Sequence, residues 1–79
     1  MPTVRRFGRC RIEMYFGDHP PPHFHVITRG GEKVVFRIDS LMQWAGEADT
    51  RDIAEALEWA AENRAELFQR WQQYSEEES

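Results

Sequence analysis

The sequence predicts an α+β fold: an antiparallel meander of three or four strands over residues 3–38, packed on one face by two C-terminal helices over residues 50–62 and 63–75. Two observations predict this class. In the first half, polar and apolar residues alternate, which is the period of a half-buried strand. In the second half, apolar residues recur every three or four positions, which is the period of an amphipathic helix. A chain of 79 residues is expected to form a single domain, residues 1–79.

The strand signals follow one another along the first half. RCRIEMYF (9–16) alternates strictly, HFHVIT (23–28) and KVVFRID (33–39) come next, and TVRRF (3–7) is expected as a short edge strand. Gly30 and Gly31 mark the turn between the segments 23–28 and 33–39. The face toward the helices is expected to bury the apolar residues Cys10, Ile12, Met14, Phe16, Phe24, Val26, Val34, Phe36 and Ile38.

The helical half begins near residue 50. Asp49 or Thr50 suits the N-cap of the first helix. Asn63, followed three residues later by Glu66, resembles a capping box and predicts that a second helix starts there. No Gly or Pro forces a break, so one continuous helix over residues 50–74 remains an alternative. The three tryptophans are expected to pack in the core or at its rim: Trp44, Trp59 and Trp71.

Charge is divided unevenly between the two halves. Residues 1–38 carry seven Arg or Lys against three acids, a net charge of +4, and residues 39–79 carry three against eleven, a net charge of −8. This asymmetry indicates either a charged partner or two solvated faces that attract each other. The single cysteine, the absence of a long apolar run and the absence of a leader pattern predict a soluble cytoplasmic protein that does not enter a membrane.

The sheet face turned away from the helices is expected to be basic. Four residues are candidates for nucleic-acid contacts, and Tyr15 is expected beside them: Arg9, Arg11, Lys33 and Arg37. His23 and His25 join this face only if the loop around Gly30 and Gly31 has an odd length or a bulge. A two-residue turn would instead pair Arg29 with Glu32 and point both histidines into the core. We favour the odd-length loop, because two buried histidines would each need a polar partner.

The stretch DHPPPHFHV (18–26) holds every histidine of the chain and leaves three interpretations open. In the first, His23 and His25 are the acid and base of a metal-independent ribonuclease without a cofactor, supported by Arg11, Arg37 and Tyr15. In the second, a divalent metal ion is held by Asp18, His19, His23 and His25. In the third, His23 and His25 hydrogen-bond to loop carbonyls and fix the proline turn.

The segments RIEMYFGDHPPPHFHV and LEWAAENRAELFQRW resemble the small bacterial domain of unknown function 4160, over nearly the whole chain. The chain departs from that pattern at residues 26–28 and over 42–50. The resemblance implies no reaction. It implies that the gene lies beside a gene for a second small domain. Such gene pairs are regarded as toxin–antitoxin modules, in which this chain would be the toxin-like member. The matching residues are Met14, Tyr15, Phe16, Asp18, His19, Pro21, Pro22, His23, Phe24 and His25.

Three functions therefore remain to be distinguished. The first is a toxin-like protein that acts on RNA through a basic, histidine-bearing sheet face. The second is a non-catalytic module that docks a small cognate antitoxin-like protein. The third is a histidine metal-binding domain.

Overall fold

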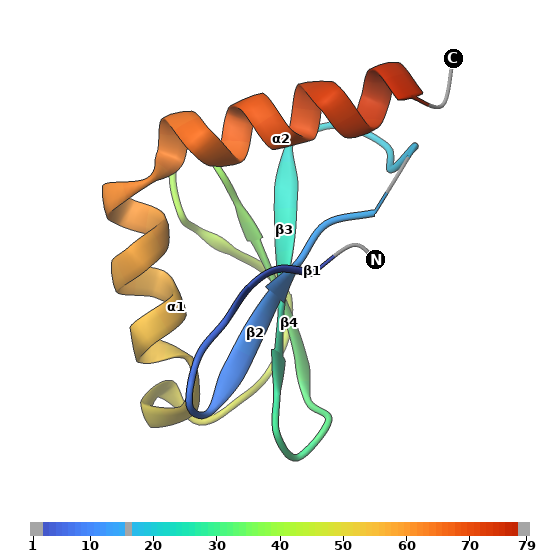
Figure 1. Cartoon of the computed structure of the whole chain (residues 1–79). Coiled ribbons are helices and arrows are strands. Elements are labelled where there is room, and N and C mark those ends of the chain that lie inside the picture. The colour runs from blue at the N-terminus through green and yellow to red at the C-terminus, as the bar shows by residue number, and fades with distance from the viewer. Residues whose placement is uncertain (1–2, 16, 78–79) are drawn as a thin grey trace.

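The computed structural model describes residues 3–15 and 17–77 and contains one antiparallel sheet followed by two helices (Figure 1). The strands follow chain order across the sheet, β1-β2-β3-β4-β5, so the topology is a meander. Its elements are β1 (Thr3–Arg6), β2 (Cys10–Glu13), β3 (His23–Thr28), β4 (Lys33–Arg37), β5 (Gln43–Gly46), α1 (Thr50–Glu62) and α2 (Arg64–Glu77). The predicted α+β class is confirmed, with one strand more than expected.

The loop between β3 and β4 has the odd length on which the orientation of the histidines depends. Phe24 pairs with Phe36 and His25 with Val35, so Thr28 stands opposite Glu32 and three residues form the loop. The Thr28 amide donates to the Glu32 carbonyl over 2.9 Å, and the Gly31 amide donates to the Thr28 carbonyl over 3.0 Å. Gly31 has a φ of 93°, a conformation that favours glycine. The two-residue turn is therefore excluded, and His23 and His25 lie on the sheet face opposite Phe24 and Val26.

The fifth strand was missed because its sequence carries no strand signal. Gln43–Gly46 shows no alternation of apolar and polar residues, and all four residues are exposed. Backbone pairing with β4 forms this strand instead, between Val35 and Ala45 and between Val34 and Gly46. Its place at the edge sets Trp44 beside the open face of the sheet.

The two helices are separate, as predicted. The Asp49 side chain accepts a hydrogen bond from the Arg51 amide over 2.9 Å, so Asp49 is the N-cap of α1. Asn63 interrupts the helix at φ −129° and ψ 32°, and its amide nitrogen Nδ2 donates to the Trp59 carbonyl over 2.8 Å. Asn63 therefore caps the end of α1, rather than opening α2 in a capping box, and the helical axis changes direction there (Figure 1).

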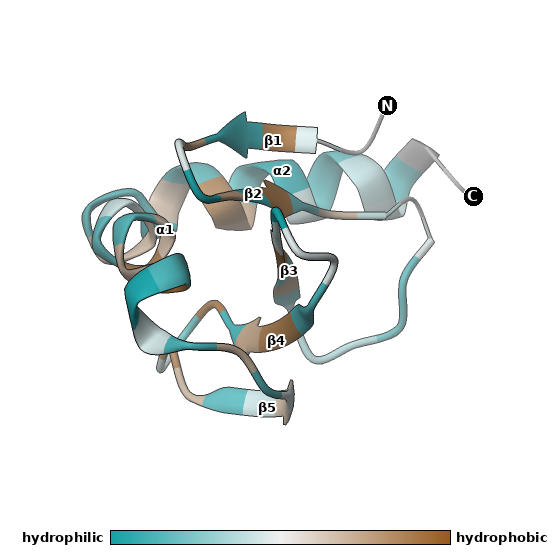
Figure 2. Cartoon of the chain, turned by 90° about the horizontal axis from the view of Figure 1, so that it is seen from below, coloured by the Kyte–Doolittle hydropathy of each residue, from teal (hydrophilic) through white to brown (hydrophobic). Residues whose placement is uncertain are grey.

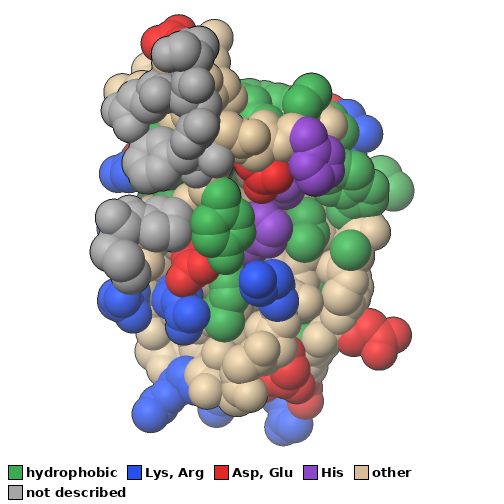
Figure 3. Space-filling view, turned by 90° about the vertical axis from the view of Figure 1, so that its right-hand side faces the viewer, with side chains coloured by type: hydrophobic (Ala, Val, Ile, Leu, Met, Phe, Trp, Pro, Cys, Tyr) green, Lys and Arg blue, Asp and Glu red, His purple; other side chains and the backbone are tan. Residues whose placement is uncertain are grey.

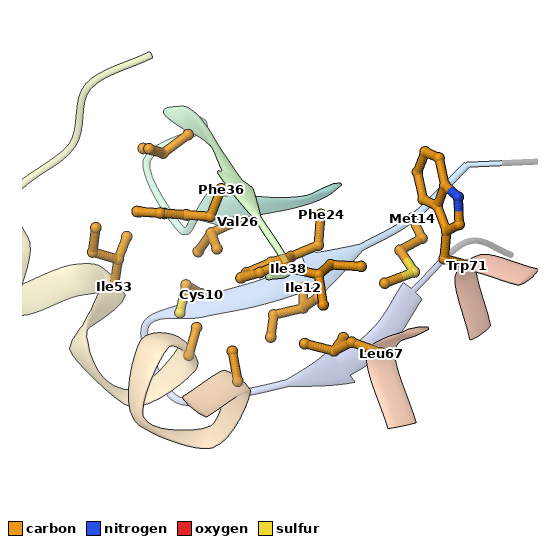
Figure 4. Packing of buried hydrophobic residues seen from close by; sticks show 13 residues of the cluster. Cys10, Ile12, Met14, Phe24, Val26, Phe36, Ile38, Ile53, Leu67 and Trp71 are labelled. Atoms are coloured by element: carbon orange, nitrogen blue, oxygen red, sulfur yellow. The ribbon is translucent and has the colours of Figure 1, made fainter. Parts of the chain in front are cut away.

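The core lies between the sheet and the two helices (Figure 4). Ile12, Phe24, Val26 and Val34 are fully buried on the sheet side. The helices contribute Ile53, Ala56, Ala60, Leu67 and Trp71. Cys10 is buried as predicted, whereas Phe16 lies outside the described residues. In Figure 2 hydrophilic residues cover much of α1 and α2, which agrees with solvated outer helix faces.

Candidate functional site

The histidine stretch forms a cluster at one end of the open sheet face. His23 is the first residue of β3 and His25 lies two positions further, so both rings stand on the same side of the strand. Asp18 reaches them from the segment that joins β2 to β3. The exposed fractions of these side chains are 3% for His23, 14% for His25 and 16% for Asp18. The cluster is thus nearly closed to solvent on the His23 side.

Both imidazole rings point a nitrogen at the same carboxylate oxygen. Asp18 Oδ2 lies 2.9 Å from His23 Nε2 and 3.4 Å from His25 Nε2. The three residues offer one donor atom each, all within 4.8 Å of one another. His19 stands apart, with its side chain 79% exposed and its Nδ1 3.3 Å from the other oxygen of Asp18. The structure therefore brings together three of the four residues predicted as metal ligands.

The hydrogen bonds of His23 fix where its proton sits. Its Nδ1 lies 2.7 Å from the Pro21 carbonyl oxygen, which can only accept, so Nδ1 carries a hydrogen and donates it. In a neutral ring Nε2 is then a bare lone pair, and it faces the Asp18 carboxylate at 2.9 Å. Two acceptors at this distance repel each other unless a cation, either a second proton or a metal ion, lies between them. The contact with Pro21 bears out the expected loop carbonyl for His23, whereas His25 has no such partner among the described residues.

The protonation tendencies of the other two members suit a metal ligand set. Burial would raise the pKa of Asp18, but hydrogen bonding to His25 and the charge of His23 outweigh it and hold the pKa below its usual value. Burial lowers the pKa of His25, and Asp18 only partly offsets that effect. Asp18 is therefore ionised and His25 neutral near pH 7, the forms in which these side chains bind metals. His25 Nδ1 is buried without a hydrogen-bond partner among the described residues.

A hollow of about 280 Å³ opens beside the cluster, and its other walls are His19, Val35, Trp44 and Ala45. The Trp44 ring lies 5.1 Å from the His23 ring and is 45% exposed, so it forms the outer wall. On the inner side the Trp71 ring of α2 lies 5.0 Å from the His23 ring. Figure 3 shows histidine surface next to a carboxylate above, with Lys and Arg side chains around the lower part of the same face.

Glu13 ties two of the three predicted supporting residues, Arg11 and Tyr15, into one network. Its carboxylate accepts a hydrogen bond from Arg11 Nε over 2.6 Å and from the Tyr15 hydroxyl over 2.7 Å. The Tyr15 ring stands edge-on to His25 at 4.7 Å. Burial and the bond to Glu13 raise the pKa of Tyr15 to about 12, so it stays protonated at neutral pH. Arg11 and Tyr15 thus lie near the histidines, with Glu13 as their direct partner.

Replacing Glu13 with glutamine is expected to remove an acid-sensitive part of the stability. Burial alone would raise the pKa of Glu13, but hydrogen bonds from Arg11 and Tyr15 outweigh it, and the pKa lies below its usual 4.5. The carboxylate therefore stabilises the fold above the unfolded-state pKa, and this contribution is lost as pH falls through the folded-state pKa. Urea unfolding at pH 7 should show Glu13→Gln destabilised by about 1–3 kcal/mol. The difference from wild type should shrink toward pH 3, and a constant difference would contradict this assignment.

Of the remaining predicted cations, Arg9 and Arg37 pair with acids away from the histidines, and Lys33 stays near the cluster. Arg37 lies directly opposite His23 but donates to Asp39 over 2.8 Å, and Arg9 lies 3.5 Å from Asp52 on α1. Lys33 remains near the cluster, with its Nζ 5.7 Å from the centre of the Tyr15 ring. Arg9 is therefore drawn toward the helical layer and away from the histidines. The roles of these residues in catalysis and nucleic-acid binding stay predictions.

Sequence reasoning missed three residues on this side of the molecule. Trp44 lines the hollow only because β5 exists, and no pattern in the sequence predicts β5. Arg6 joins the open face through its pairing with Arg11 across β1 and β2. Arg29 lies on the same face because the pairing of β3 with the β2 side continues one residue past Thr28, where the Arg29 amide donates to the Arg9 carbonyl. Both arginines could have been placed on this face by fixing the strand register of β1 and the length of the loop at Gly30 and Gly31.

Comparison with protein families matches residues 10–72 to the domain of unknown function DUF4160. The chain belongs to this family. No curated protein and no solved structure matches the chain. The DUF4160 match covers every residue of the histidine cluster. Within the part of the chain that the structure describes, neither helix has the length and apolar character needed to cross a membrane.

Proposed function

We propose that this DUF4160 chain is a metal-binding domain, in which Asp18, His23 and His25 hold one divalent transition-metal ion. The observation that carries the proposal is the short contact between His23 Nε2 and Asp18 Oδ2, with the other nitrogen of His23 committed to the Pro21 carbonyl. Metal-bound histidines commonly donate their second nitrogen to a carbonyl or a carboxylate in this way. The proposal takes up the metal-binding domain, the third of the functions left open by the sequence, in place of the cofactor-free action on RNA that we placed first.

The two separations between Asp18 Oδ2 and the histidine nitrogens support a shared ion. Ligand atoms about 2.0–2.2 Å from one ion lie about 3.0–3.5 Å apart in octahedral or tetrahedral sites. The separations of 2.9 Å and 3.4 Å around Asp18 Oδ2 fall close to this range. Two imidazoles and one carboxylate form a set that suits Zn²⁺, Fe²⁺ or Mn²⁺ and leaves positions open for a further ligand. A bound ion of this kind supplies a positive charge that polarises a ligand oxygen and acidifies bound water.

Metal titration tests the proposal. Chelator-treated protein should take up one equivalent of Zn²⁺ or Co²⁺ per chain, and the ion should raise the unfolding temperature by mass action. His23→Ala and His25→Ala should lose this uptake, whereas His19→Ala should retain it because His19 stands apart from the cluster. Less than stoichiometric uptake by the wild-type protein would refute the proposal. Equal loss in the His19 variant would return that residue to the ligand set.

Action on RNA, as the toxin-like member of a pair, is a second candidate function. The observation that favours it is the gathering of four cations, Arg6, Arg11, Arg29 and Lys33, on the same face as the histidines. His23 and His25 would act on a phosphodiester there, with Arg11, Arg37 and Tyr15 in support. Loss of RNA cleavage or growth inhibition in His23→Ala/His25→Ala, with partner binding retained, would support this function. Full activity of that double variant would rule it out.

Docking of a small cognate protein is favoured by the exposed apolar residues at the free edge of the sheet. Met42 and Trp44 are 66% and 45% exposed, beside and within β5. Exposed sheet edges that carry apolar residues are common docking surfaces. Co-purification with the product of the neighbouring gene tests this function, and a loss of the complex on Met42→Ser would assign it to this edge.

A further inference from the structure

A second hollow lies on the open face at the end away from the histidines. It measures about 210 Å³, and three arginines are among its lining residues, together with Phe7, Gly8, Cys10 and Ile27. The arginines are Arg6, Arg11 and Arg29, which come from β1, from β2 and from the loop after β3. Three separate segments of the chain thus place positive charge around one opening.

These cations are poorly neutralised by the protein itself. Arg6 and Arg11 stand directly opposite each other in the β1–β2 pair, and like charges in that relation repel. Arg11 is partly neutralised by Glu13 at 2.6 Å. Among the described residues, no carboxylate oxygen lies within ion-pair distance of Arg6 or Arg29. The opening therefore has two guanidinium groups available for an external anion.

We propose that this hollow, defined by Arg6, Arg11 and Arg29, binds a backbone phosphate of single-stranded RNA whose chain runs on to the Asp18–His23–His25 cluster. The inference deepens the RNA-directed candidate function and does not depend on a bound metal. Guanidinium groups bind phosphate oxygens through paired, charge-assisted hydrogen bonds. Phosphate contacts of this kind provide most of the affinity in sequence-independent binding of single strands.

The distance between the two sites suits a short strand. Ile27 lines the hollow and lies two residues from His25 along β3, which is about 7 Å, and Arg29 lies about twice as far. A stacked strand advances about 3.4 Å per nucleotide, so about four nucleotides bridge Arg29 and His25. Lys33 pairs with Ile27 and stands on the path between them. At the far end the exposed face of Trp44 offers a surface on which a base can stack.

Binding of a labelled single-stranded RNA octamer by the metal-free protein tests the inference. Arg6→Gln/Arg29→Gln should weaken binding on the order of tenfold and reduce the slope of log K against log salt by about 0.7, the contribution of the one phosphate bound in the hollow. The matched control is Arg64→Gln/Arg70→Gln on α2, which changes net charge equally and should bind like wild type. Arg29 lies in an exposed loop, and Arg29→Gln alone should show about half of this change in slope. This single variant still tests the inference if the double variant misfolds.

Three results would overturn the inference: no octamer binding by the wild-type protein, equal binding by the Arg6/Arg29 and control variants, or equal binding of an RNA duplex of the same length. A dinucleotide, which cannot span both sites, should bind much more weakly than the octamer. Metal uptake should be unchanged in Arg6→Gln/Arg29→Gln. Lack of RNA binding would therefore not contradict the metal proposal, and lack of metal uptake would not contradict RNA binding by the arginine hollow.

Discussion

Asp18→Asn should abolish metal binding while leaving the fold intact, because the carboxylate is the one anionic ligand and the point where both histidines converge. The asparagine amide is close in shape, and its NH₂ group can donate to the lone pair on His23 Nε2, 2.9 Å from the present oxygen. Because the pKa of Asp18 is lowered in the fold, its carboxylate contributes to stability at pH 7, and the metal-free variant should fold with a modest loss of stability relative to the metal-free wild type. Metal affinity should fall on the order of 100-fold or more, since even the loss of an indirect partner costs about 10–100-fold.

Calorimetric titration with Zn²⁺ and absorption spectra with Co²⁺ measure this effect. Asp39→Asn is the matched control, because Asp39 is an exposed carboxylate on the same side that pairs with Arg37 and has no contact with the histidines. It changes net charge by the same amount and should bind metal like wild type. Wild-type affinity in Asp18→Asn would place the ion elsewhere. A large loss of stability without metal would assign Asp18 a structural role.

The elements with a strong local signal were predictable from sequence. β2 alternates without interruption, and α1 has both a capping residue and an apolar stripe, so their type and position follow from residues close in sequence. Strand β5 escaped because its stability comes from backbone pairing with β4 and its four side chains are exposed. Propensity and periodicity report what side chains bury, and this strand buries almost nothing.

The candidate site was predictable in composition but not in geometry. The spacing of His23 and His25 implied that they share a face of one strand, and the three-residue loop sets that face opposite Phe24 and Val26. The sequence did not show that Pro21 fixes the proton of His23 or that Trp71 covers the same ring. Both depend on how the proline segment folds back and on where α2 crosses the sheet. Neither is encoded in a short window of residues.

The edge strand that walls the histidine hollow is expected to depend on a single glycine. Gly46 has a φ of 83°, and a Cβ there would lie 2.1 Å from the Lys33 carbonyl oxygen in the neighbouring strand. Gly46→Ala should therefore carry the left-handed backbone penalty of about 1–2 kcal/mol and, in addition, force β5 away from β4. We expect a total loss of more than about 3 kcal/mol, a large share of the stability of a small domain.

Gly31→Ala is the control that separates the two effects. Gly31 has a φ of 93°, but nothing lies within 4 Å of an added Cβ, so this variant carries the backbone penalty without the clash. Urea unfolding followed by tryptophan fluorescence should show Gly46→Ala clearly less stable than Gly31→Ala, with Trp44 more exposed before the transition. Equal unfolding free energies of the two variants would mean that β5 can be displaced at little cost. The wall that β5 forms beside the histidine hollow would then not be rigid. A large difference would show that the strand without a sequence signal is held in register by one close backbone approach.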